Sequence, residues 1–212
     1  MPERARFDAV IFDLLTALLD SWSLWDSVAG DPDVGRRWRL AYLEIVYATG
    51  NYRPYELLVM EACDKIGLDV DLADRLLDRW DELQPYADVP GVLSRLREGV
   101  PRGVVTNCSE ALGNRAVART GASFDVIVTA ERAGAYKPRP EPYRTVLAEL
   151  GTDPARTLFV AGSPGDIGGA GGVGMPVFWH NHVGIDLAVN AAQPWRQARS
   201  LDPLLALVDG EV

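Results

Sequence analysis

FDAVIFDLL, residues 7–15, is the stretch that decides the fold of this chain. Within it, residues 9–12 form a short, continuous apolar run that stops at Asp13. A run of this length followed by a polar residue is typical of a strand that is buried on both faces of a parallel sheet. The stretch therefore predicts a central parallel strand with a carboxylate at its C-terminal end.

An alternation of strand and helix resumes after residue 99 and continues to the end of the chain. Repeated units of this kind imply an α/β fold, a doubly wound parallel sheet that is covered by helices. In such a sheet, ligands bind beyond the carboxyl ends of the strands. The expected strands are residues 102–107, 125–129, 157–162 and 176–180, and the expected helices are residues 110–119, 141–150, 166–173 and 203–208.

Residues 22–86 follow a different pattern, with helical periodicity and no good strand. Apolar residues between positions 34 and 49 recur at spacings of three and four, which predicts an amphipathic helix. Further helices are expected at residues 54–67 and 72–83. We therefore expect an α/β core formed by residues 1–21 and 87–212, with residues 22–86 inserted as an all-helical cap above the site.

The composition favours a folded protein that acts on a small ligand. The chain has 212 residues, of which 48% are hydrophobic, and this suffices for a packed core. No apolar stretch reaches about 18 residues, so we expect no membrane partner. The net charge of −9 argues against a nucleic-acid partner, because a phosphate backbone requires a basic surface. A small anionic substrate can still bind where the pocket is locally basic.

Cysteine usage and the first residues predict a cytoplasmic location. Cys63 and Cys108 lie far apart in different predicted elements, which is poor material for a disulfide framework or a zinc site. Residues 1–10 lack the apolar region and cleavage site of a secretory signal. His180 and His182 form the string HNH, which is a weak metal set by itself and is expected in a loop at the rim of the sheet.

Polar side chains follow four of the predicted strands. Asp13 follows the first strand, Thr106 and Asn107 end the second, Lys137 lies in the loop after the third, and Asp166 follows the fourth. Because the carboxyl ends of parallel strands share one edge of the sheet, we expect these side chains to converge on one site.

Four motifs in this order resemble the haloacid dehalogenase superfamily over nearly the whole chain. They are VIFDLLTALLDSW (10–22), VVTNCSE (104–110), KPRPEPY (137–143) and LFVAGSPGDIGGAGGVGMPVFW (158–179). The resemblance implies that Asp13 is a nucleophile that forms a covalent ester intermediate. It also implies a helical cap and a possible homodimer.

The residues after Asp13 depart from the pattern of the family's phosphatases. Those enzymes carry a second Asp two positions on, followed by Gly and Thr, where this chain has Leu15, Thr16 and Ala17. Leu15 cannot donate the proton that an alkoxide leaving group requires, whereas a halide leaves without one. The resemblance is therefore strongest to the 2-haloacid dehalogenases, with Thr16 offering a hydroxyl one position from the missing threonine.

The segment around Asp166 favours the same branch. Metal-dependent relatives carry two acidic residues here, and in residues 161–166 only Asp166 remains. Mg²⁺ held by Asp13 and Asp166 alone would bind weakly, so we expect neither a metal nor a cofactor. In the dehalogenase branch, Asp166 would orient or deprotonate the water that cleaves the ester, with Ser163 beside it. A helix N-cap is the simpler alternative for Asp166.

The resemblance assigns roles to the remaining site residues. Lys137 would hold Asp13 ionised, and Tyr143 matches a tyrosine of the dehalogenase branch, although it could simply pack on its helix. Arg39, in WRLAYLE, matches a cap-helix arginine that helps the halide leave; a solvated basic face is the alternative. Thr106 and Asn107 would bind the substrate's carboxylate.

Three functions therefore remain open from the sequence. The leading hypothesis is a metal-independent hydrolytic dehalogenase of short 2-haloacids. The first alternative is a Mg²⁺-dependent phosphatase of a small phosphorylated metabolite, against which Leu15 and Gly162 count. The second is a catalytically silent binding protein on the same fold.

Overall fold

A computed structural model describes residues 7–210, so residues 1–6, which belong to the stretch where we expected no secretory signal, lie outside it. The described chain contains a six-stranded sheet in the order β3-β2-β1-β4-β5-β6, and every neighbouring pair is parallel. The predicted doubly wound α/β fold is confirmed. The strands are β1 (Ala9–Asp13), β2 (Arg102–Thr106), β3 (Val126–Thr129), β4 (Thr157–Ala161), β5 (Val177–His180) and β6 (Arg196–Ala198).

β1 lies in the middle of the sheet because its residues are apolar on both faces. All five of its residues are buried. Ile11 packs in the cluster on one face, and Val10 and Phe12 pack in the cluster on the other. In register, Asp13 lies beside Val105 of β2, so the polar residues that follow these two strands begin at the same level.

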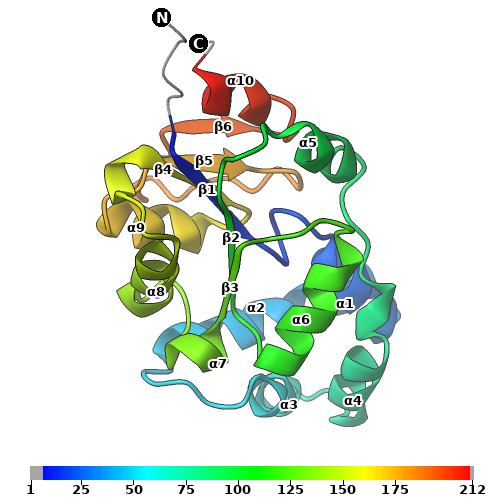
Figure 1. Ribbon diagram of the computed structural model, residues 1–212. Coiled ribbons are helices and arrows are strands. Elements are labelled where there is room, and N and C mark those ends of the chain that lie inside the picture. The colour runs from blue at the N-terminus through cyan, green and yellow to red at the C-terminus, as the bar shows by residue number, and fades with distance from the viewer. Residues whose placement is uncertain (1–6, 211–212) are drawn as a thin grey trace, which may run out of the picture.

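Helices cover both faces of the sheet (Figure 1). α8 and α9 contribute to the cluster that contains Ile11, and α5, α6 and α10 contribute to the opposite cluster. The short edge strand β6 and the helices α5 and α7 were not predicted. β6 and α7 are too brief to show a period, whereas α5 carries apolar residues at helical spacings that were not recognised. The elements after the insert are α5 (Val89–Arg95), α6 (Glu110–Arg119), α7 (Ala130–Ala133), α8 (Pro140–Leu150), η2 (Pro154–Arg156), α9 (Pro164–Gly172) and α10 (Leu204–Asp209).

The segment between β1 and α5 is helical, and Figure 1 shows its helices gathered at one end of the sheet. The longest of them, α2, starts where the Asp31 side chain accepts a hydrogen bond from Val34 N and Pro32 occupies the first turn. The helix expected at 72–83 is interrupted at Arg79. The elements are α1 (Ser21–Ala29), α2 (Pro32–Ala48), α3 (Tyr55–Lys65), α4 (Asp71–Asp78) and η1 (Trp80–Glu82).

We call Ser21–Glu82 the helical insert. The chain enters and leaves it through two adjacent segments, joined by an antiparallel bridge between Leu19 and Pro85 and by a hydrogen bond from Tyr86 N to Leu18 O. Aromatic side chains form its interior, with the rings of Trp25 and Trp38 4.5 Å apart. No helix in residues 7–210 has the length and apolar character that crossing a membrane requires.

Candidate active site

The carboxylate of Asp13 is fixed at the end of β1 by donors from its own loop. Its Oδ2 accepts hydrogen bonds from Thr16 N (2.9 Å), Thr16 Oγ1 (2.5 Å) and Ala17 N (3.0 Å). Its Oδ1 accepts one, from Lys137 Nζ at 2.7 Å. Three donors therefore hold one oxygen in place, and the other oxygen is left as the one that can react.

The offset of Thr16 from the family position does not keep it from the nucleophile. The loop after β1 turns so tightly that both its amide and its hydroxyl reach Asp13 Oδ2. Gly162, after β4, packs directly against this loop: a Cβ there would lie 2.1 Å from Thr16 C and 2.2 Å from Ala17 N. No side chain fits at position 162, so the close approach of the two loops requires a glycine there.

Lys137 joins the two buried aspartates. Its Nζ lies 2.7 Å from Asp13 Oδ1 and 3.1 Å from Asp166 Oδ2, and its side chain is 4% exposed. Asn107 holds the lysine backbone from both sides, accepting from Lys137 N at 2.8 Å and donating to Lys137 O at 3.0 Å. The ammonium group is thus positioned by the loop after β2 as well as by its own loop.

Asp166 has two further contacts. Tyr143 OH donates to its Oδ1 at 2.7 Å, and Ser163 Oγ lies 3.3 Å from its Oδ2. Tyr143 is fully buried and is absent from the pocket wall, so the structure places it as a support for Asp166 rather than against a substrate. Asp166 lies in the first turn of α9, and its side chain is not the cap of that helix.

The environment separates the protonation behaviour of the two aspartates. Burial favours a raised pKa for Asp13, but the charge of Lys137 and hydrogen bonds from Lys137 and Thr16 bring that pKa below its ordinary value. Burial raises the pKa of Asp166, and the charge of Asp13 adds to this rise against the attraction of Lys137. One carboxylate stays ionised while its neighbour takes up a proton more readily, a division that suits a nucleophile and a base.

Arg39 is a buried cation that forms no ion pair within residues 7–210, although the charges of Asp13 and Asp26 act on it. It lies on α2, is 5% exposed, and its guanidinium stacks 4.0 Å from the ring centroid of Trp22. Its Nη1 is buried and meets no hydrogen-bond partner in the part of the chain that the structure describes. Burial lowers the pKa of Arg39, yet a guanidinium remains charged at neutral pH. A buried charge left in this way is costly unless an anion joins it.

The core and the helical insert enclose one cavity of about 60 Å³ between these groups. Arg39 reaches it from the insert, together with Tyr42, Leu43 and Tyr47, which lie on the same side of α2 at spacings of three and four. That spacing was visible in the sequence, but Tyr42 and Leu43 were not among the predicted site residues. The lining residues are Asp13, Leu15, Thr16, Trp22, Arg39, Tyr42, Leu43, Tyr47, Asn107, Lys137, Pro138, Ser163, Gly165 and Asp166.

The structure does not bring Thr106 to this cavity, contrary to its predicted role in substrate binding. Its side chain is fully buried, and its Oγ1 lies 3.2 Å from Cys108 Sγ. Asn107 does border the cavity, although one hydrogen of its amide is committed to Lys137 O. Cys108 is no nucleophile in this setting, because burial raises its pKa to about 12.

The aspartates do not form a site that fits Mg²⁺. The ammonium group of Lys137 lies between them and contacts the oxygens that would face the metal. Asp13 Oδ2 already accepts three hydrogen bonds, and Asp166 Oδ1 accepts one from Tyr143. Mg²⁺ requires near-octahedral oxygen ligands, whereas in residues 161–166 only Asp166 carries a carboxylate.

Comparisons with known proteins agree with this arrangement. The family model of the haloacid dehalogenase-like hydrolases matches residues 7–174. The chain is 29% identical to haloacetate dehalogenase H-2 of Moraxella sp. (strain B), covering 84% of this chain and 88% of the relative. It is 30% identical to an (S)-2-haloacid dehalogenase of Xanthobacter autotrophicus, covering 80% of this chain and 73% of the relative.

Solved structures share the fold over almost the full chain. A dehalogenase solved with an intermediate complex superposes with a TM-score of 0.84 and 25% identity, covering 97% of this chain and 99% of the other. The L-2-haloacid dehalogenase of Xanthobacter autotrophicus with chloropropionic acid covalently bound gives a TM-score of 0.83 at 24% identity, covering 97% of this chain and 100% of the other. The second likeness concerns the fold alone.

Proposed function

Because the chain belongs to the haloacid dehalogenase-like hydrolases, we propose that it is a hydrolytic dehalogenase of short 2-haloacids that works without a metal. One observation carries the proposal. An ionised carboxylate, Asp13, and a buried cation without a partner, Arg39, border the same small cavity. A reaction in which a carboxylate displaces an anion needs these two groups on opposite sides of a carbon atom.

In the first step, Asp13 Oδ1 attacks the carbon that bears the halogen. The carbon–halogen bond breaks as the carbon–oxygen bond forms, and the halide leaves with the bonding electrons. Arg39 receives the halide, and the site's low water content strengthens this attraction. No proton is transferred in this step, so the apolar Leu15 beside the nucleophile is no obstacle.

In the second step, water attacks the carbonyl carbon of the ester on Asp13. Once Oδ1 is bonded to the substrate, Oδ2 is the carbonyl oxygen, and its three donors from Thr16 and Ala17 stabilise the negative charge that develops on it. Asp166, with its raised pKa, takes a proton from the water. Asp166 passes that proton to the departing alkoxide oxygen, so that the hydroxy acid leaves, and the remaining proton of the attacking water is released to solvent as Asp13 returns to its ionised form.

The cavity limits the substrate to a short acid. The cavity has a volume of only about 60 Å³, which favours a substrate with few non-hydrogen atoms. Chloroacetate has that size. We propose that its carboxylate lies against the second amide hydrogen of Asn107 and the hydroxyl of Ser163, which both border the cavity.

We propose that residues 22–86 act as a cap on a core of residues 1–21 and 87–212. The insert carries Arg39, and the core carries Asp13, Lys137 and Asp166, so the site is complete only when the two lie together. Contacts between them include Tyr42 OH with Asn107 O at 3.3 Å and Trp80 Nε1 with Leu112 O at 3.0 Å. Closure around a substrate would exclude bulk water.

Halide and phosphate release test the proposal directly. The purified chain is incubated with chloroacetate or 2-chloropropionate in EDTA, and with a panel of phosphate esters in Mg²⁺. We expect halide release in EDTA.

Asp166→Asn should slow the second step, so the ester intermediate should accumulate after reaction with chloroacetate. Peptide mass spectrometry should then find one additional carboxymethyl group on Asp13. Phosphate release only in Mg²⁺, or no product from either panel, would contradict the proposal.

A further inference from the structure

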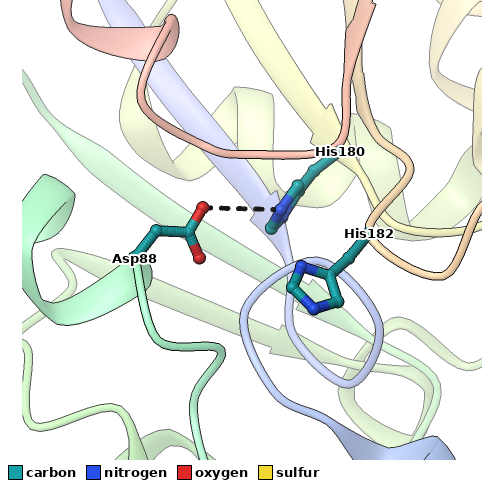
Figure 2. Close-up of side chains that lie close together, drawn as sticks. All are labelled: Asp88, His180 and His182. Carbon is teal, nitrogen blue, oxygen red and sulfur yellow. Dashed lines mark ion pairs between the residues drawn. The ribbon is translucent and has the colours of Figure 1, made fainter.

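Three potential metal ligands meet at the junction between the helical insert and the sheet (Figure 2). Asp88 lies just before α5, on the segment that returns from the insert, and His180 and His182 lie at and beyond the end of β5. One ligand atom from each of the three lies within 4.8 Å of the others, and His180 Nε2 is 3.7 Å from Asp88 Oδ2. Tetrahedral bonds of about 2.0–2.2 Å to Zn²⁺ would place ligand atoms about 3.4 Å apart.

His180, which is buried, and Asp88, which is partly buried, each carry a buried polar atom that the described chain leaves unsatisfied. His180 is fully buried, and its Nδ1 lies 2.7 Å from Ala17 O, so Nδ1 carries the hydrogen and Nε2 presents a lone pair. Neither His180 Nε2 nor Asp88 Oδ1 meets a hydrogen-bond partner in residues 7–210. Donation from the other ring nitrogen to a backbone carbonyl is the usual arrangement of a histidine that binds a metal.

The third ligand is accessible and can move. His182 is exposed, and its ring stacks on Tyr86 with centroids 3.9 Å apart. It borders a groove of about 330 Å³ that also contains Asp20, Asp26 and Asp33, opposed by the single positive charge of Arg36. A cation can therefore reach the group through an acidic entrance, and rotation of His182 can shorten the remaining ligand distances.

We propose that Asp88, His180 and His182 form a binding site for Zn²⁺ or a similar first-row divalent metal, separate from the site of dehalogenation. Two imidazole nitrogens and one carboxylate oxygen suit such metals better than Mg²⁺, which prefers oxygen ligands.

A metal here would bind together segments that the fold otherwise only packs against each other. Asp88 belongs to the chain that leaves the insert, and the two histidines belong to the sheet. His180 Nδ1 also donates a hydrogen bond to Ala17 O. The backbone N–H of the same residue, Ala17, donates to Asp13. The proposal is therefore a structural site that stabilises the junction, and it holds whether or not the chain is a dehalogenase.

Metal titration of the untagged chain tests this site. After treatment with EDTA and its removal, we expect calorimetry to give one Zn²⁺ per chain, and Co²⁺ to give the intense visible absorption of a tetrahedral complex. Since only the folded chain holds the ligands together, Tm should rise by about 5–10 °C at a hundredfold excess of Zn²⁺ over Kd.

Two variants at proposed ligands and one control variant test which side chains bind the metal. His182→Asn alters an exposed side chain, and Asp88→Asn keeps an oxygen for the hydrogen bond from Leu201 N, so both should fold. We expect each to weaken Zn²⁺ binding at least tenfold and to abolish the Co²⁺ absorption. Asp186→Asn, an exposed acid nearby that is outside the group, should bind as the parent does. Absence of stoichiometric binding in the parent, or unchanged binding in both ligand variants, would overturn the proposal.

Discussion

Two cations are buried in the candidate active site, and their surroundings differ. Lys137, from the core, is 4% exposed and lies within 3.1 Å of two carboxylates. Arg39, from the helical insert, is 5% exposed and meets an aromatic ring and a cavity instead. Both charges have been removed from water, but only one of them is balanced by the protein itself.

The difference separates what stabilises the fold from what serves the reaction. Lys137 belongs to a group that is electrostatically complete before any substrate arrives, and it fixes the nucleophile in its ionised form. In the proposed mechanism, Arg39 is kept in an unfavourable state that an incoming halogen substituent relieves as it becomes a halide. The same substitution at the two positions should therefore change stability in opposite directions.

Removing the proposed nucleophile, Asp13, should have the largest effect. Asp13→Asn cannot form the ester, and we expect kcat/KM for chloroacetate to fall by about 10⁴-fold or more, as for other covalent nucleophiles. A halide-release assay measures this. Activity within tenfold of the parent would mean that another group attacks the substrate.

Lys137→Met should impair both activity and stability. We expect kcat/KM to fall by about 10³-fold, because the nucleophile loses the cation that holds it ionised. Two buried carboxylates without their partner should also lower the free energy of unfolding by about 3–5 kcal/mol. Chemical denaturation measures the second effect, and a variant as stable as the parent would contradict the reading of Lys137 as the balanced cation.

The loss of stability in Lys137→Met should depend on pH in a defined direction. In the parent, the lowered pKa of Asp13 contributes stability that is present above the unfolded-state pKa and is lost as pH falls through the folded-state pKa. Without the lysine this contribution disappears. The difference in Tm between parent and variant should thus be large at neutral pH and shrink as the medium becomes acidic.

Arg39→Met should lower activity while leaving the fold at least as stable. We expect kcat/KM to fall by about 10²-fold, since the halide leaves without a cation. Relief of a buried, unpaired charge should raise Tm by about 2–4 °C, which corresponds to about 1 kcal/mol in a chain of this size. Arg37→Met, at an exposed neighbouring position, serves as the control and should change neither quantity. A fall in Tm as large as that of Lys137→Met would show that Arg39 is balanced after all.

Tyr143→Phe should produce the smallest change. The hydrogen bond from Tyr143 lowers the pKa of Asp166, so its loss should raise that pKa further. Because Asp166 acts after the irreversible loss of halide, the acidic limb of kcat against pH, measured where ester hydrolysis limits the rate, should then move to higher pH, with only a few-fold loss of kcat at neutral pH. An unchanged limb would remove Asp166 as the base.

Much of this site could be predicted from the sequence because topology brings strand ends together. Asp13, Lys137 and Asp166 each follow a strand of one parallel sheet, and the structure places them in contact. Arg39 was predicted from the resemblance of WRLAYLE to the cap helix of the dehalogenase branch, and the helical periodicity of that segment places it on α2. What these positions share is that secondary structure alone decides which edge or face they occupy.

The other features of the site depended on side-chain directions and loop contacts, which spacing in the sequence does not specify. Thr106 ends the correct strand, but its methyl group packs near Gly113 of α6 and its hydroxyl lies by Cys108. Tyr143 lies at the expected distance along the chain from Lys137, yet only the packing of α8 against α9 shows that it supports Asp166. The close approach of Gly162 to Thr16 likewise depends on two loops distant in sequence.

The three donors on Asp13 Oδ2 have a consequence that isotopes would reveal. In the proposed mechanism, Oδ2 is held in place and Oδ1 leaves with each product. The oxygen of the water that hydrolyses the ester therefore takes the Oδ1 position. In ¹⁸O-labelled water, the first product molecule should carry ordinary oxygen from the enzyme and every later one should carry the label. After many turnovers, peptide mass spectrometry should find a single heavy oxygen on Asp13. Its other oxygen, Oδ2, should remain ¹⁶O, because the mechanism never transfers it to a product.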